Sequence, residues 1–133
     1  MPARPKPNGA LQFALHDASK LVSFAKHLDS LGKPRSAIKV WCDAGAAEEI
    51  VSVLLEAVGR TAEAGVHRAS AATCYEKGRI YPRAVSLLQA ALAAQVAESF
   101  KRRLRRQLQR CLSMARSKLE SDARRRGRQP MPV

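Results

Sequence analysis

The 133-residue sequence has few aromatic residues, only three cysteines and no long uninterrupted hydrophobic run. A membrane-spanning helix needs about 18 consecutive apolar residues, so none is predicted, and no secretory segment opens the chain. The cysteines, Cys42, Cys74 and Cys111, are odd in number and widely spaced, which argues against a disulfide framework or a zinc site. We expect reduced core thiols in an intracellular protein, in the cytoplasm first, with nuclear and organellar locations left open.

Signals of catalysis are also scarce. The sequence contains no Gly-rich phosphate loop. His16, His27 and His67 stand alone, without an adjacent nucleophile and orienting acid, and are interpreted as surface or boundary histidines. The neighbouring Glu48 and Glu49 are interpreted as a solvated face. The sequence therefore predicts a protein that is not an enzyme, with no cofactor, no metal ion and no small-molecule substrate.

What the sequence does contain is helix-forming residues, above all Ala, Leu, Arg, Gln and Glu, which predict an all-α fold. Gly and Pro residues separate the expected helices, and Gly45 marks a point where one of them could bend. Between Pro82 and the C-terminal helix no such residue intervenes, and we place a break near Glu98 or Ser99. The predicted organisation is a disordered basic, Pro-rich tail (1–9), a helical-bundle domain (10–122) made of hairpins 10–58 and 62–98 and a closing helix 99–122, and a disordered basic tail (123–133).

An internal repeat supports the two hairpins. Small and large residues recur with the same intervals 47 residues apart. Small side chains let two helices approach closely, and large ones fill the space beside them. We therefore expect these positions to be buried, with Trp41 as a core anchor, Tyr75 in the hairpin packing and Tyr81 half exposed. The first copy is Ala25, Leu28, Ala37, Trp41 and Ala44; the second is Ala72, Tyr75, Ala84, Leu88 and Ala91.

The C-terminal helix holds most of the charge. Residues 101–128 contain 12 Lys or Arg and 2 Asp or Glu, in a chain of net charge +13. At helical spacing one apolar stripe is predicted to complete the core, namely Phe100, Leu104, Leu108, Cys111, Leu112, Ala115 and Leu119. The rest of the helix forms a positive ridge without acidic residues from Lys101 to Arg116. The predicted partner-binding residues are Lys101, Arg102, Arg103, Arg105, Arg106, Arg110, Met114, Arg116, Ser117 and Arg124.

The repeated hairpin pattern resembles tetratricopeptide repeats and, more closely, MIT (microtubule-interacting and trafficking) domains, which are three-helix bundles. Residues 79–84 (RIYPRA) resemble the start of the family's second helix and 110–119 (RCLSMARSKL) its third. The hairpin 18–55, with Asp29, Gly32, Ala37 and Trp41, resembles another copy. The third helix departs from the family by having Met114-Ala115-Arg116 where Arg-Ala-Glu is usual. In the family, carboxylates on that helix commonly receive basic residues of the partner peptide. If the same groove is used here, the resemblance implies that its charge preference is reversed or that its partner belongs to a different class.

Three functions are consistent with this sequence. The first is an MIT-like module for trafficking, cytoskeletal or complex assembly, which binds an acidic or amphipathic helix or peptide beside the C-terminal helix. The second is an RNA- or DNA-associated protein that places the same arginines on phosphates. The third is attachment to an anionic membrane surface through the same arginines, for which no exposed Trp, Phe or Leu insertion face is expected.

Overall fold

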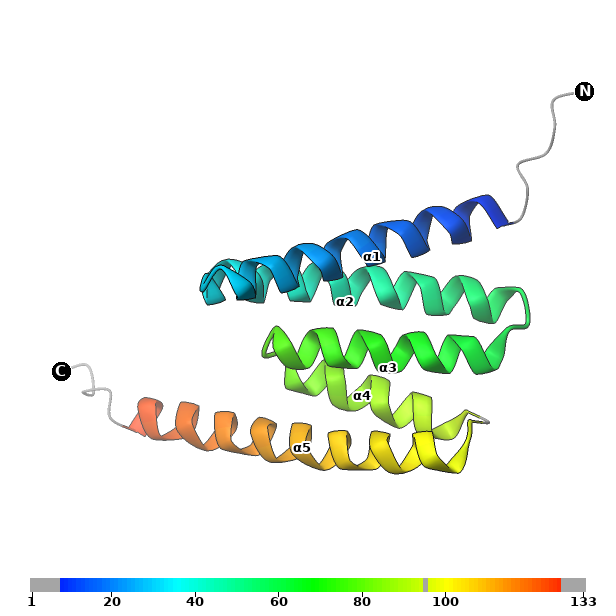
Figure 1. Cartoon of the computed structure of the whole chain (residues 1–133). Helices are drawn as coiled ribbons and strands as arrows, with labels where there is room; N and C mark the ends of the chain where they lie inside the picture. Colours follow the sequence, from blue (N-terminus) through cyan, green and yellow to red (C-terminus); the bar gives the residue numbers. More distant parts are fainter. Residues whose placement is uncertain (1–7, 95, 128–133) are drawn as a thin grey trace, which may run out of the picture.

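The computed structural model describes residues 8–94 and 96–127, and in this part of the chain all regular structure is helical (Figure 1). The fold is an all-α bundle, as predicted from the composition. No strand occurs among the described residues. The part of the chain that the structure describes forms five helices: α1 (Asn8–Ser30), α2 (Pro34–Ala57), α3 (Thr61–Lys77), α4 (Tyr81–Ala93) and α5 (Glu98–Gly127).

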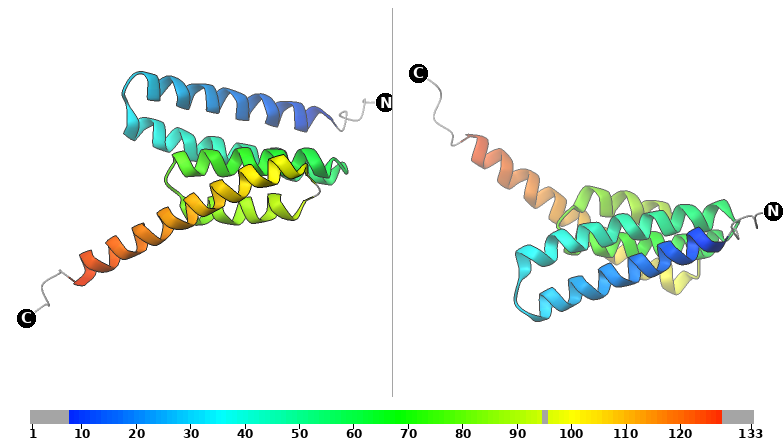
Figure 2. Two further views of the ribbon diagram at one scale, coloured as in Figure 1. Left: turned by 60° about the horizontal axis from the view of Figure 1, so that its bottom comes forward. Right: turned by 90° about the horizontal axis from the view of Figure 1, so that it is seen from above.

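Each helix packs against the next one along the chain: α1 on α2, α2 on α3, α3 on α4, and α4 on α5. The bundle is therefore a stack of antiparallel hairpins, with α1 at one end and α5 at the other (Figure 1). A second view shows α5 crossing α3 and α4 and running well beyond them (Figure 2). Both end helices consequently keep one side without a neighbouring helix among the described residues.

The α1–α2 and α3–α4 turns have the same backbone conformation at positions 47 residues apart, the spacing of the internal repeat. Gly32 has φ +69° in the α1–α2 turn, and Arg79, 47 positions later, has φ +63° in the α3–α4 turn. In the first turn the Lys33 backbone N–H donates to the Leu28 carbonyl at 3.0 Å; in the second Ile80 donates to Tyr75 at 2.8 Å. These bonds satisfy carbonyls at the helix ends and fix the same chain reversal in both turns. The α2–α3 turn has it as well, with Gly59 at φ +80° and the Arg60 N–H donating to the Leu55 carbonyl at 2.9 Å.

The ten positions of the repeat are all buried, as the repeat predicted. Trp41 lies in the core between α1 and α2, and its indole Nε1 donates to Asp29 Oδ2 at 2.8 Å. The expectation for Tyr81 was wrong, because this side chain is only 9% exposed. Placed at the first turn of α4, it belongs to the interior rather than to the boundary.

Helix α2 is continuous through Gly45, so the possible bend there does not occur. A Cβ atom on this glycine would lie 3.0 Å from three ring atoms of Tyr75 on α3. Gly45 is thus a close-approach position that makes room for an aromatic ring.

The helix boundaries differ from the predicted ones mainly at the ends of the chain. Helix α1 begins at Asn8, so residues 8 and 9 belong to a helix rather than to the predicted tail 1–9. Helix α5 continues to Gly127, so residues 123–127 are helical rather than part of the predicted tail 123–133. The remainder of both predicted tails, 1–7 and 128–133, lies outside the described residues. Helix α4 ends at Ala93 and α5 begins at Glu98, so the two helices are separate and α5 begins where the break was predicted.

Candidate functional site

Only the first half of α5 completes the core. Leu104 and Cys111 are buried among α3 and α4 residues, with Phe100 and Leu108 packed beside them. Beyond Cys111 the helix has no buried residue. Leu112 is 40% exposed and Leu119 66% exposed, so the prediction that the whole stripe is buried was wrong for these two residues. We call residues 112–127 the overhang.

Helix length explains the overhang. Helix α5 has 30 residues, whereas α3 has 17 and α4 has 13. At about 1.5 Å of rise per residue, the two shorter helices can cover only the first half of α5. The apolar stripe nevertheless continues, because Leu112, Ala115 and Leu119 follow one another at steps of three and four. The overhang therefore presents an apolar strip with no helix packed on it in the described structure (Figure 2).

The residues predicted as a binding site surround α5 rather than forming one surface. All ten are on this helix, and all but the half-buried Lys101 are exposed. At about 100° per residue, Arg102, Arg106, Ser117 and Arg124 point away from the apolar stripe. Met114 and Arg116 instead lie on its two flanks. One helical partner cannot contact all ten residues at once.

Some of the predicted arginines have carboxylate partners. Arg105 Nη1 lies 3.1 Å from Glu98 Oε1 within α5, and Arg124 lies 3.9 Å from Glu120. Arg110 reaches across to α3, where its Nε and Nη2 donate to the two oxygens of Glu76 at 2.6 and 2.9 Å. The stretch from Lys101 to Arg116 has no acidic residue of its own, so the carboxylate partners of Arg105 and Arg110 come from outside it.

The contact between Arg110 and Glu76 is the centre of a polar network that holds α5 on α3. Gln107 Nε2 donates to Thr73 Oγ1 at 2.9 Å and to Glu76 Oε1 at 3.2 Å. The Arg110 hydrogen bond holds the pKa of the Glu76 carboxyl below its ordinary value. Arg110 thus has a structural role at the point where α5 leaves the bundle.

The overhang carries an open hollow of about 510 Å³. It combines the apolar strip with polar and basic side chains, and its lining residues are Gln109, Leu112, Ser113, Ala115, Arg116 and Leu119. Lys118 and Arg125 lie on the other flank of the strip by helical spacing. The sequence prediction missed Leu112, Leu119 and Lys118 as surface residues. The signal that could have found them is the length of the last helix compared with its neighbours.

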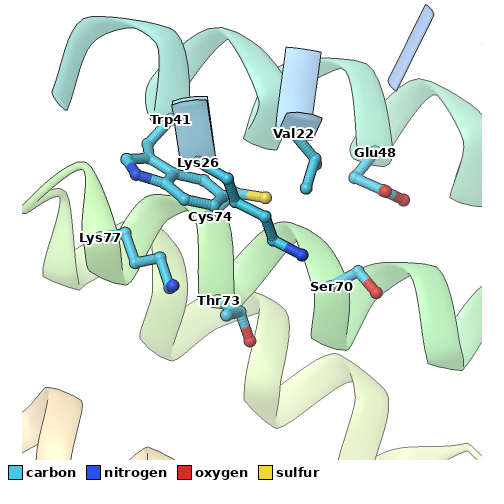
Figure 3. Close-up of a pocket in the computed structure, with 8 residues that line it drawn as sticks. All are labelled: Val22, Lys26, Trp41, Glu48, Ser70, Thr73, Cys74 and Lys77. Carbon is cyan, nitrogen blue, oxygen red and sulfur yellow. The ribbon is translucent and has the colours of Figure 1, made fainter. Parts of the chain in front are cut away.

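A second hollow, of about 320 Å³, opens between α1, α2 and α3 (Figure 3). Lys26 and Lys77 stand at its rim, and Lys77 Nζ lies 4.6 Å from the centroid of the Trp41 ring. Cys74 lines the wall, but burial raises the pKa of its thiol to about 12. The thiol is therefore protonated at neutral pH and a poor nucleophile.

Glu48 and Glu49 are not a solvated face, which corrects the sequence interpretation. Glu48 is buried, and its Oε2 lies 2.6 Å from His67 Nδ1 on α3. Glu49 accepts a hydrogen bond from the Tyr75 hydroxyl at 2.6 Å and another from Arg83 on α4. Burial alone would raise the pKa of Glu49, but these two donors outweigh it and lower the pKa. The two carboxylates fasten α2 to α3 and α4.

The cysteines are free, with Cys74 and Cys111 buried and Cys42 partly buried. Among residues 8–94 and 96–127, no group of three or more His, Cys, Asp or Glu side chains is arranged to hold a metal ion. None of the described helices is both long and apolar enough to cross a membrane. Comparison of the chain with protein-family profiles, curated proteins and solved structures gave no match.

Proposed function

We propose that the protein is a non-enzymatic helical interaction module that binds an acidic, amphipathic helix along the overhang of α5. The observation that carries this proposal is the continuation of the apolar stripe past the bundle, where Leu112 and Leu119 are exposed. A helical partner with apolar residues at steps of three and four would cover this strip.

Charge favours an acidic partner. The overhang contains five Lys or Arg and two Asp or Glu. Arg116 on one flank of the strip, and Lys118 and Arg125 on the other, would face carboxylates at the edges of a helix docked between them. Two overhangs would instead repel each other, which disfavours a second copy of the chain at this surface.

The MIT resemblance supports the same site. It places residues 110–119 at the helix that the family uses for partner binding, with Arg116 at the position of a usual glutamate. The proposed role in trafficking, cytoskeletal or complex assembly rests on that resemblance alone. An intracellular, first of all cytoplasmic, location belongs to the same proposal.

Nucleic acid is the second candidate. The observation that favours it is the set of arginines on the side of α5 away from the strip, including Arg102 and Arg106, which have no carboxylate partner among the described residues. Phosphates could bind there without sequence readout. No exposed aromatic side chain lies beside these arginines for base stacking, because Phe100 is packed against the core.

A capture experiment from nuclease-treated lysate separates the two candidates. The wild-type chain is compared with two variants. Leu112→Gln/Leu119→Gln removes the apolar strip, and Arg102→Gln/Arg106→Gln removes positive charge from the side of α5 that points away from the strip. Glutamine keeps helix propensity nearly constant in both variants. The proposal expects proteins that persist after nuclease treatment and are lost with the leucine variant. Loss of all captured proteins on nuclease treatment would contradict it.

A further inference from the structure

Helix α1, at the opposite end of the bundle from α5, has an exposed row of residues in the spacing of a coiled-coil seam. The steps along this row are alternately three and four residues, which places all its members on one side of the helix. By helical spacing the row lies on a flank of α1, roughly a third of a turn from the side that packs on α2, where Leu11, Ala14, Ala18, Ala25 and Leu28 are buried. Its members, all exposed, are Ala10, Phe13, Asp17, Lys20, Phe24 and His27 in α1, and Leu31 in the turn that follows the helix.

The side of α1 directly opposite α2 is polar, with Gln12, His16 and Ser23, and the large members of the row are exposed on the flank beside it. Phe13 is 74% exposed, Phe24 51% and Leu31 54%. End units of stacked helical hairpins normally present a polar outer face to water. Phe13 and Phe24, separated by 11 residues or about three helical turns, are exposed apolar side chains on either side of the charged Asp17 and Lys20, and a partner helix can cover them.

The row is self-complementary when two copies of α1 run antiparallel. If Phe13 of one chain faces Phe24 of the other, the same two-fold axis places Asp17 opposite Lys20 of the second chain. The two-fold axis generates each pair twice. Two Phe13–Phe24 pairs therefore lie at the outer ends of the interface, and two Asp17–Lys20 pairs of opposite charge lie between them. A charged layer inside such a seam fixes the register, because any shifted pairing would bury a charge without its partner.

The net charge of α1 also favours self-association at this helix rather than at α5. It contains two Lys and two Asp and so has no formal net charge, in a chain of net charge +13. Asp17 and Lys20 form no ion pair among the described residues, so both are available to a second chain. Helix α5 carries eleven Lys or Arg and three Asp or Glu, which makes the other end of the bundle repulsive toward its own copy.

We propose that two copies of the chain associate through α1 in an antiparallel, two-fold symmetric helix pair, with the pairs Phe13–Phe24 and Asp17–Lys20 across the interface. A single helix pair of this length buries less surface than the roughly 1,200 Å² typical of a stable dimer. The association is therefore weak and concentration-dependent, and it leaves α5 of each copy free. This inference does not depend on the function proposed for the overhang.

Sedimentation equilibrium of the full chain, measured from low to high micromolar concentration at physiological salt, tests this arrangement. The wild type should move from monomer toward dimer over this range. Asp17→Lys places two lysines opposite each other in each of the two central pairs. The dissociation constant of the dimer should therefore rise at least tenfold. The exchange Asp17→Lys/Lys20→Asp reverses both charges and should restore it.

The matched control is Leu15→Gln, which changes an apolar residue on the opposite side of α1 and should leave the dimer unchanged. Circular dichroism of each variant verifies that the bundle is intact. A wild-type chain that stays monomeric throughout the range would overturn the proposal. So would a dimer that is insensitive to Asp17→Lys, or one that the charge exchange does not restore.

Discussion

Arg110 on α5 and Glu76 on α3 form a two-point ion pair, with N–O distances of 2.6 and 2.9 Å, next to the point where α5 leaves the bundle core. The neighbouring Cys111 is the final buried residue of the helix. This pair therefore marks the boundary between the part of α5 that stabilises the fold and the part that extends beyond it.

Arg110→Gln should lower the free energy of unfolding by up to about 1 kcal/mol, the upper range for a partly exposed ion pair. Arg102→Gln removes an equal charge without a carboxylate partner and should leave stability unchanged or slightly raised. Urea denaturation of Arg110→Gln, Glu76→Gln and Glu76→Gln/Arg110→Gln measures the coupling energy of the pair, with Arg102→Gln as the control. Equal changes in the free energy of unfolding for Arg110→Gln and Arg102→Gln would show that the ion pair between Arg110 and Glu76 contributes nothing to stability.

Acid should destabilise the bundle through Glu49 and Glu76. Both carboxyls have a folded-state pKa below the ordinary value of 4.5, so their charged forms favour the folded state. Their contribution is complete above that ordinary value and is lost as the pH falls through the lowered pKa. Denaturation measured between about pH 5 and about pH 3 should show a shallower loss of stability for Glu49→Gln/Glu76→Gln than for the wild type. Parallel curves would contradict this assignment.

Trp41→Ala should destabilise the chain by about 3–5 kcal/mol, because it leaves a large cavity between α1 and α2 and removes the hydrogen bond to Asp29. Trp41→Phe keeps most of the volume and should cost less. Chemical denaturation followed by circular dichroism gives both values. A change near zero for the alanine variant would mean that Trp41 is not a core anchor.

Arg79→Gly should stabilise the α3–α4 turn by about 0.5–1 kcal/mol, because a non-glycine residue at φ +63° is strained and glycine is not. Gly32→Ala, at the equivalent position of the first turn, should destabilise by a similar amount. Thermal or urea unfolding of the two variants measures whether their changes in stability have opposite signs. Two changes of the same sign would disprove the equivalence of the turns.

The sequence predicted the fold well because its main signals are local. Breaks at Gly and Pro located the helices, and the spacing of residues such as Ala25, Trp41 and Leu88 correctly identified buried positions. The stripe of α5 was harder, since periodicity shows which side of a helix is apolar but not how far a neighbouring helix extends along it. Leu119 was therefore expected in the core although no helix covers it in the described structure.

The sequence also did not predict the polar contacts between residues far apart in the chain. Glu76 and Arg110 are separated by 34 positions, and Glu49 and Tyr75 by 26, so no helical spacing connects them. Glu48 and Glu49 were assigned to solvent because neighbouring carboxylates usually are. Their partners, His67, Tyr75 and Arg83, lie on other helices and become neighbours only when the hairpins stack.

The apolar strip of the overhang is the decisive feature of the proposed binding site, and a binding titration tests it. The probe is a labelled helical peptide with leucines at steps of three and four and glutamates on both flanks, titrated with the full chain at physiological salt. The wild type should bind it saturably, and Leu112→Gln/Leu119→Gln should bind at least about tenfold more weakly, since two partly buried leucine contacts contribute more than about 1.4 kcal/mol. The affinity for duplex DNA should be equal for both proteins. Unchanged peptide affinity in the leucine variant, or no saturable binding by the wild type, would show that the strip is not a binding site.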